Sequence, residues 1–356
     1  MDRRVISLTM PADLPPPGMR LTLDADALIA NWRALDRLSG TASAGAAIKA
    51  DAYGLGARRV AALLQQAGCA DFFVAHWSEA GDLLDLLRPG SIAVLHGPLC
   101  PADAAFARES GLVPVINSLH QARLWQEAGG GLCHLMVDTG INRLGLPLAA
   151  LGDPMVTGLQ VDLLLSHLAS ADEDSPLNPL QRDRWNEARS QIAHRRASLA
   201  NSAGIALGSG YHGDLTRPGI ALYGGVPCAA LQPHIRQVAR PEAQIIQVRE
   251  LEAGDSVGYN ATFTAAAPMR IGVVGLGYAD GYLRCWSGKG AMLADGARLP
   301  VLGRVSMDMT VIDLAASPEV GEGDWVALDY ALPEAAALSG LSQYELLTAL
   351  GRRFPS

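Results

Sequence analysis

Lys49 follows a short apolar run, a place in the sequence where a lysine amine can become reactive. Lys49 comes directly after Ala46-Ala47-Ile48, which predicts a strand, and before Ala50-Asp51-Ala52-Tyr53-Gly54-Leu55-Gly56. Burial at the carboxyl end of a strand lowers the pKa of a lysine amine and makes it a Schiff-base former or a base. Position alone fits a surface lysine in a loop equally well.

Other polar side chains stand near the ends of later apolar runs. Arg143 lies in Asp138-Thr139-Gly140-Ile141-Asn142-Arg143-Leu144-Gly145, His167 follows the run 159–165, and Arg217 precedes Pro218-Gly219. A guanidinium fork suits a carboxylate and keeps its charge. Taken singly, His167 is better explained as a core histidine, and Arg217 equally well as a surface salt-bridge residue.

The elements that would position these side chains alternate along the chain. Between residues 26 and 222, short apolar runs are followed by amphipathic stretches, with helices predicted near 57–67, 78–87, 101–109, 119–128 and 179–194. This alternation implies parallel strands joined through helices, and about eight such units match a closed (β/α)₈ barrel. An open doubly wound sheet is the alternative, but no early strand precedes G-x-G-x-x-G.

After Gly224-Gly225 the pattern changes. Residues 240–330 read as short strands broken by Gly, Asp and Pro, with one late helix at about 342–351. This pattern predicts a small β-rich domain. We therefore expect an α/β chain with a mobile N-terminal extension at 1–19, a TIM barrel at 20–235 and a C-terminal β domain at 236–356.

Composition excludes several classes of protein. The 356 residues are 49% hydrophobic and 18% charged, enough apolar surface for a sizeable core. A net charge of −8 without a basic run argues against nucleic-acid and membrane partners. Five cysteines without a C-x-x-C pair predict neither a disulfide framework nor a metal site. With Val5 to Met10 too short for a secretion signal, we expect a cytoplasmic protein.

The string around Lys49 resembles the pyridoxal-phosphate lysine motif of alanine racemases, A-x-x-K-A-D/N-A-Y-G-H-G, with Leu55 in place of the histidine. Residues 138–145 look like the family's D-T-G-x-x-R-x-G, and 166–172 are similar to T/S-H-F/L-A-x-A-D. Asn201-Ser202, residues 217–224, and three strings of the β domain at 257–262, 277–281 and 303–308 also resemble family motifs. The matches come in order and span about residues 20–355.

The resemblance implies a fold-type III enzyme that holds pyridoxal 5′-phosphate on Lys49 and interconverts L- and D-alanine, supplying D-alanine for peptidoglycan. Arg143 would bind the substrate carboxylate, and His167 would lie beside the cofactor ring. The groups implied for the phosphate are the hydroxyls of Tyr53 and Ser202, the backbone at Gly219 and Ile220, and Arg352, which aligns with a late tyrosine of the family.

Arg217 matches the family arginine that faces the pyridine nitrogen. An arginine stays protonated, so it donates a hydrogen bond but hardly a proton. The pyridine then remains neutral and is a weaker electron sink than one paired with a carboxylate. This favours racemisation over aminotransfer.

Racemisation needs a base on each face of a planar carbanion. Lys49 serves one face, and the resemblance assigns the other to Tyr259, whose phenolate must be favoured by nearby cations or donors. In the family this tyrosine and the methionine matching Met307 enter from the partner subunit, which implies a homodimer with shared sites. Without the motif, Tyr259 reads as a half-buried strand aromatic.

Met136 departs from the family pattern. Many members carry a carbamylated lysine at this position, seven residues before the carboxylate-binding arginine. A thioether carries no charge, so we hypothesise that an anion such as chloride, or Asn142, braces Arg143 instead. A simple core methionine is compatible with either version.

Three alternatives remain open from the sequence. One is a racemase of broader specificity that accepts serine, lysine or arginine, because pocket width decides specificity. Another is a non-catalytic pyridoxal-phosphate-binding protein, which would have no need of the β domain or Tyr259. The third is a decarboxylase on the same plan, which would be expected to pair the pyridine nitrogen with a carboxylate rather than Arg217.

Overall fold

The computed structural model describes residues 16–350 and 353–354. By its internal contacts the chain divides into two compact units, one of residues 22–240 and 329–350, the other of residues 16–21, 241–328 and 353–354. The sequence-derived boundaries at 1–19, 20–235 and 236–356 stay a proposal. Residues 1–15 of the expected extension lie outside the described residues, and the first strand, β1 (Met19–Leu23), begins at its end.

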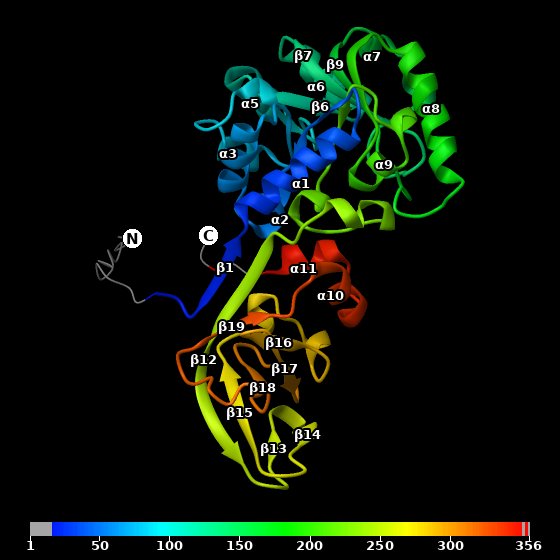
Figure 1. The fold of residues 1–356 in the computed structure, drawn as a ribbon. Coiled ribbons are helices and arrows are strands. Elements are labelled where there is room, and N and C mark those ends of the chain that lie inside the picture. The colour runs from blue at the N-terminus through cyan, green and yellow to red at the C-terminus, as the bar shows by residue number, and fades with distance from the viewer. Residues whose placement is uncertain (1–15, 351–352, 355–356) are drawn as a thin grey trace, which may run out of the picture. The chain divides into compact units, whose positions relative to one another are not determined.

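The larger unit is built on a parallel sheet (Figure 1). Its strands run in the order β10-β9-β7-β6-β5-β4-β3, and β11 pairs with β2. The strands are β2 (Ser43–Ala44), β3 (Ala46–Ala47), β4 (Phe72–Val74), β5 (Ile92–Val94), β6 (Val113–Ile116), β7 (Leu132–Asp138), β9 (Gln160–Leu165), β10 (His194–Ser198) and β11 (Leu215–Thr216), with β8 (Leu146–Pro147) beside β7.

Backbone hydrogen bonds close the sheet into a barrel. Gly45 alone separates β2 from β3, so the two act as one strand between β11 and β4. On the other side of β11, the amide of Asp214 donates to Ala197 O at 2.8 Å and that of Arg217 to Ala200 O at 2.9 Å. The TIM-barrel prediction is confirmed.

Helices follow the strands, as expected for crossovers. They are α1 (Ala25–Leu38), α2 (Lys49–Gly54), α3 (Ala57–Ala67), α4 (Trp77–Gly81), α5 (Pro101–Ser110), α6 (Leu119–Glu127), α7 (Pro154–Thr157), α8 (Leu177–Gln191), α9 (Ser202–Ala206), α10 (Leu332–Ser339) and α11 (Gln343–Ala349). The helix expected at 78–87 is shorter, because α4 ends at Gly81 and single turns follow. Helix α10 was not predicted at all.

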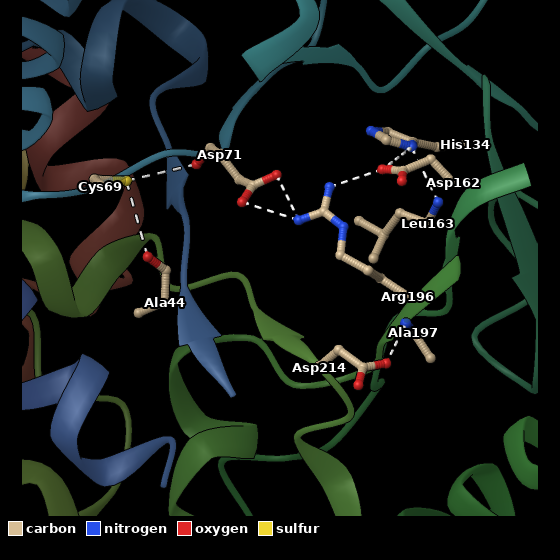
Figure 2. A network of polar contacts seen from close by, with 9 residues as sticks. All are labelled: Ala44, Cys69, Asp71, His134, Asp162, Leu163, Arg196, Ala197 and Asp214. Carbon is tan, nitrogen blue, oxygen red and sulfur yellow. Dashed lines mark hydrogen bonds and ion pairs between the residues drawn. The ribbon is translucent and has the colours of Figure 1, made fainter. Parts of the chain in front are cut away.

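The barrel interior is layered. An apolar layer that includes Phe73, Met136, Leu163 and Leu165 fills its middle. Beneath it, near the amino ends of the strands, Arg196 of β10 reaches both Asp71, 2.9 Å away, and Asp162 of β9, 2.7 Å away (Figure 2). The charges therefore stabilise the base of the barrel, and the opposite, carboxyl end of the strands is left for chemistry.

The smaller unit is an antiparallel β-barrel. Strand β12 (Ala239–Leu251) pairs with both β15 (Met269–Val274) and β19 (Trp325–Leu328), which closes the sheet β12-β15-β18-β17-β16-β19. Its other strands are β16 (Ala291–Ala294), β17 (Ala297–Leu302) and β18 (Thr310–Asp313), and β13 (Ser256–Val257) with β14 (Phe263–Thr264) forms a separate hairpin. Along the described ranges 16–350 and 353–354, no helix is long and apolar enough to cross a membrane.

Candidate active site

A cavity of about 910 Å³ opens at the carboxyl ends of the barrel strands. Most of the predicted site residues share it. Its lining includes Lys49, Tyr53, Arg143, His167, Ser202, Arg217, Gly219 and Ile220. Tyr259 and Met307 belong to the β-barrel unit, and Arg352 lies outside the described residues.

Lys49 opens a turn of left-handed backbone. The four residues after it, Ala50 to Tyr53, have φ between 51° and 60° although none is glycine. Left-handed backbone costs an L-residue roughly 1–2 kcal/mol, so local bonds must hold it. The amide of Ala50 donates to Glu79 Oε1 at 2.5 Å, and the amide of Ala57 to Asp51 Oδ1 at 2.6 Å.

This turn exposes the Lys49 amine to the cavity while the backbone around it is tied down. Burial and the positive charge of Arg143 lower the pKa of Lys49, and the carboxylate of Glu79 opposes them. A lysine that loses its proton more readily is a better nucleophile and base. Location and electrostatics thus agree with the chemistry expected of Lys49.

Donors for a phosphate gather at one part of the cavity. Ser202 Oγ accepts hydrogen bonds from the amides of Gly219, at 2.9 Å, and Ala221, at 3.3 Å. A Cβ on Gly219 would lie 2.3 Å from the hydroxyl oxygen of Tyr53, so only glycine fits beneath that ring. Hydroxyls and backbone amides together form a cradle suited to an anion.

Arg217 is a buried cation that lines the cavity, and none of its hydrogen-bond partners among the described residues is a carboxylate. Its guanidinium donates to Ser198 Oγ and to Ser166 O. It is 7% exposed, and burial lowers its pKa to about 10. A buried charge needs polar partners, and an uncharged ring nitrogen that accepts a hydrogen bond supplies one.

His167 is held neutral. Burial, followed by the charges of Arg217, Arg143 and Lys49, lowers its pKa to about 3. A neutral imidazole can lie against an aromatic ring without adding a charge to a cluster that is already positive. Together, the amine, the cradle and the buried Arg217 guanidinium fit pyridoxal phosphate.

Arg143 is exposed, and its side chain makes no hydrogen bond or ion pair with the other described residues. Its loop is ordered instead by Asp138, whose Oδ1 accepts from the amides of Gly140, Ile141 and Asn142 at 2.8–3.2 Å. The Asn142 side-chain amide donates to Gly140 O, and its oxygen accepts no hydrogen bond from Arg143. Met136 is buried at 6% exposure in the apolar layer of the barrel.

In the β-barrel unit, Tyr259 and Met307 are exposed apolar side chains. Tyr259 is 66% exposed and Met307 53%. Tyr259 lies in the loop between β13 and β14, and left-handed backbone follows it, with φ of 63° at Asn260 and 45° at Ala261. Met307 O accepts from the amide of Ala279 at 3.0 Å. Two large side chains held in the open by tight loops have the form of contact residues.

Sequence reasoning missed three residues of this region: Glu79, His96 and Tyr344. His96 lines the cavity, and its ring centroid is 4.4 Å from that of His76 in an edge-on arrangement. Tyr344 of α11 also lines it, 6.1 Å from the Tyr53 ring. Only Glu79 carried a signal, because a glutamate at the third position of a helix indicates a capping box.

Along most of its length, the chain is similar to proteins of one family. Residues 23–227 match the family model "Alanine racemase, N-terminal domain", and residues 238–356 match "Alanine racemase, C-terminal domain". The chain is 41% identical to an alanine racemase of Rhizobium meliloti over 94% of its own length and 95% of the relative's, and 43% identical to one of Rhodospirillum rubrum over 94% of each.

Solved structures of alanine racemases are also similar to this chain. The crystal structure of alanine racemase from Bartonella henselae with covalently bound pyridoxal phosphate superposes with a TM-score of 0.87 at 35% identity, covering 95% of this chain and 99% of that one. The biosynthetic alanine racemase of Pseudomonas aeruginosa gives 0.85 at 36% identity, covering 96% and 99%.

Proposed function

The chain belongs to the alanine racemase family, and we propose that it interconverts L- and D-alanine with two bases, Lys49 and the Tyr259 of a second copy. Racemisation on pyridoxal phosphate follows from the family. The two-base assignment is supported by the geometry around Lys49, whose amine lies in a cavity with the phosphate cradle and a buried guanidinium.

Pyridoxal phosphate, when bound, supplies the electron sink that makes the alanine Cα–H acidic. Arg143, exposed and without a partner among the described residues, binds the substrate carboxylate. Lys49 takes the Cα proton from D-alanine on one face, and Tyr259 takes it from L-alanine on the other. Each base returns a proton in the opposite direction.

Arg217 would donate a hydrogen bond to the ring nitrogen of the cofactor and so leave that nitrogen unprotonated. A buried guanidinium with a pKa of about 10 still holds its own proton at neutral pH, so it donates a hydrogen bond without giving the proton away. A weaker electron sink disfavours aminotransfer and decarboxylation. The same feature argues against the decarboxylase alternative.

We propose that Tyr259 and Met307, both exposed on the β-barrel unit, contact a second copy of the chain. The mouth of the barrel in turn carries exposed apolar residues of its own, Leu99 at 66% and Leu144 at 37%, beside Arg143. Exposed apolar patches of this kind mark contact surfaces. We infer a homodimer in which each mouth is completed by the partner.

Incubation of the cofactor-loaded protein with L-alanine in deuterated water tests the activity. D-alanine carrying deuterium at Cα is expected. Release of carbon dioxide would identify a decarboxylase instead, and spectral binding without product would identify a non-catalytic carrier. The same assay with L-serine, L-lysine and L-arginine measures substrate breadth.

The cellular role belongs to the same proposal. Racemisation of L-alanine supplies D-alanine for peptidoglycan. All five cysteines are free thiols, which supports a reducing compartment such as the cytoplasm.

A further inference from the structure

The Glu79 carboxylate accepts hydrogen bonds from three backbone amides, one of which belongs to the residue after Lys49. Its Oε1 accepts from Ala50, the residue after Lys49, at 2.5 Å. Its Oε2 accepts from Ala75 at 2.7 Å and from His76 at 3.0 Å. One carboxylate therefore links the turn that carries Lys49 to the carboxyl end of the next barrel strand, β4.

The turn needs this link. Four left-handed residues cost several times the roughly 1–2 kcal/mol of a single one, and the amide of Ala50 lies at their start. Asp51 fixes the far end of the turn through Ala57. Among the described residues, Glu79 is the side chain that fixes the near end, next to Lys49.

Glu79 also supplies a negative charge where positive groups dominate. The ionisable groups facing Lys49 are Arg143, His96, His167 and Glu79. In this part of the described chain Glu79 is the one anion acting on Lys49, and it acts against Arg143. Neither the capping-box pattern nor the family motifs assign Glu79 this task.

We propose that Glu79 is a positioning residue for the reaction, which fixes the backbone at Lys49 and supplies the carboxylate charge that balances Arg143 around the lysine amine. The proposal rests on Lys49 holding the cofactor. It predicts two separable effects, one from the hydrogen bonds and one from the charge.

Two substitutions separate them. Glu79→Gln removes the charge and leaves one acceptor oxygen, so at least one of the three amides loses its partner. Glu79→Asp keeps the charge but shortens the side chain. Asp153→Asn is the matched control, because Asp153 also accepts a backbone amide at a helix start, from Met155 at 2.8 Å, but is not among the charges that act on Lys49.

The readout is cofactor loading of the full-length apoprotein, followed by absorbance as a function of pH. Loading condenses the neutral Lys49 amine with the cofactor aldehyde and releases water, so its pH midpoint reports the lysine. Glu79→Gln should move the midpoint to lower pH, because loss of the anion disfavours the ammonium form. Both Glu79 variants should bind the cofactor roughly three- to tenfold more weakly.

The Glu79→Asp variant should keep the wild-type midpoint, and Asp153→Asn should match the wild type in both measurements. A Glu79→Gln protein that loads with an unchanged midpoint would overturn the proposal. Thermal unfolding of each apoprotein confirms that it is folded. If neither the wild type nor any variant binds the cofactor, the assignment of the cofactor site is wrong. That outcome differs from failure of the Glu79 assignment, in which the wild type and the control still bind it.

Discussion

At the residue scale, the site depends on glycine as much as on its reactive groups. Gly219 is one such glycine, with φ of −129° and ψ of −87° at the phosphate cradle. A side chain has no room at this position, because a Cβ would lie 2.3 Å from the Tyr53 hydroxyl oxygen and 3.5 Å from the Cβ of Ala47. The cradle is therefore specified by the absence of a side chain.

Gly219→Ala should push the Tyr53 ring out of place and weaken cofactor binding. Overpacking of this kind costs about 1–3 kcal/mol, which is roughly fivefold to a hundredfold in affinity. Gly152→Ala is the control, because a Cβ there meets no atom within 4 Å and its φ is not positive. Titration of the two apoproteins with pyridoxal phosphate compares them. Equal affinities would contradict the account of the cradle.

The sequence did not decide what replaces the family's carbamylated lysine at Met136. The structure places it in the apolar layer of the barrel, as the core reading expected. Asn142 does not brace Arg143, since its side chain bonds to Gly140 O. The chloride version of the hypothesis remains a proposal, and an anomalous-scattering map without a peak beside Arg143 would remove it.

At the scale of elements, the base of the barrel holds a histidine that burial keeps neutral. His134 of β7 is 4% exposed, and its Nδ1 accepts from the amide of Leu163 at 3.2 Å (Figure 2). Burial lowers its pKa to about 4, while the carboxylate of Asp162 acts in the opposite direction. The neutral imidazole is part of the hydrogen bonding between β7 and β9.

This burial makes barrel stability depend on pH. Because the pKa of His134 is about 4 in the folded state against 6.5 as the ordinary value, the unfolded chain binds the proton first as the pH falls. The free energy of unfolding should therefore decrease between pH 6.5 and 4. Urea unfolding of wild type and His134→Asn at several pH values measures this, and the variant should lose less stability on acidification. Parallel curves would contradict the prediction.

Much of the fold was predictable from the spacing of apolar residues. The strand and helix alternation identified the barrel, which the backbone hydrogen bonds between strands confirm. Helix α10 was missed because its run Leu-Pro-Glu-Ala-Ala-Ala-Leu-Ser has no polar face to mark a helical period. The left-handed turn at Ala50 to Tyr53 was not predictable either, since none of these residues is glycine.

The candidate site was also predictable only in part. Residues in ordered motifs, such as Lys49 and Arg217, were found and lie in one cavity. Glu79, His96 and Tyr344 were not found, because they reach the site from helices and loops distant in sequence. Only tertiary packing brings Glu79 to Ala50, 29 residues earlier in the chain.

At the scale of the whole molecule, the central claim is that one chain contributes Lys49 and another contributes Tyr259 to the same site. Two variants that are inactive alone test it: Lys49→Ala loses one base, and Tyr259→Phe loses the other. When they are mixed, dissociated and reassembled, half of the dimers should contain one intact site. The mixture should then recover about a quarter of wild-type activity.

The control mixes Lys49→Ala with Arg217→Ala, two changes in the same unit. Every site then has a damaged barrel, and activity should stay at background. The decisive measurement is alanine racemisation by the Lys49→Ala and Tyr259→Phe mixture. The account predicts restored activity in that mixture alone, whereas mixed dimers that form and remain inactive would contradict a site shared between chains.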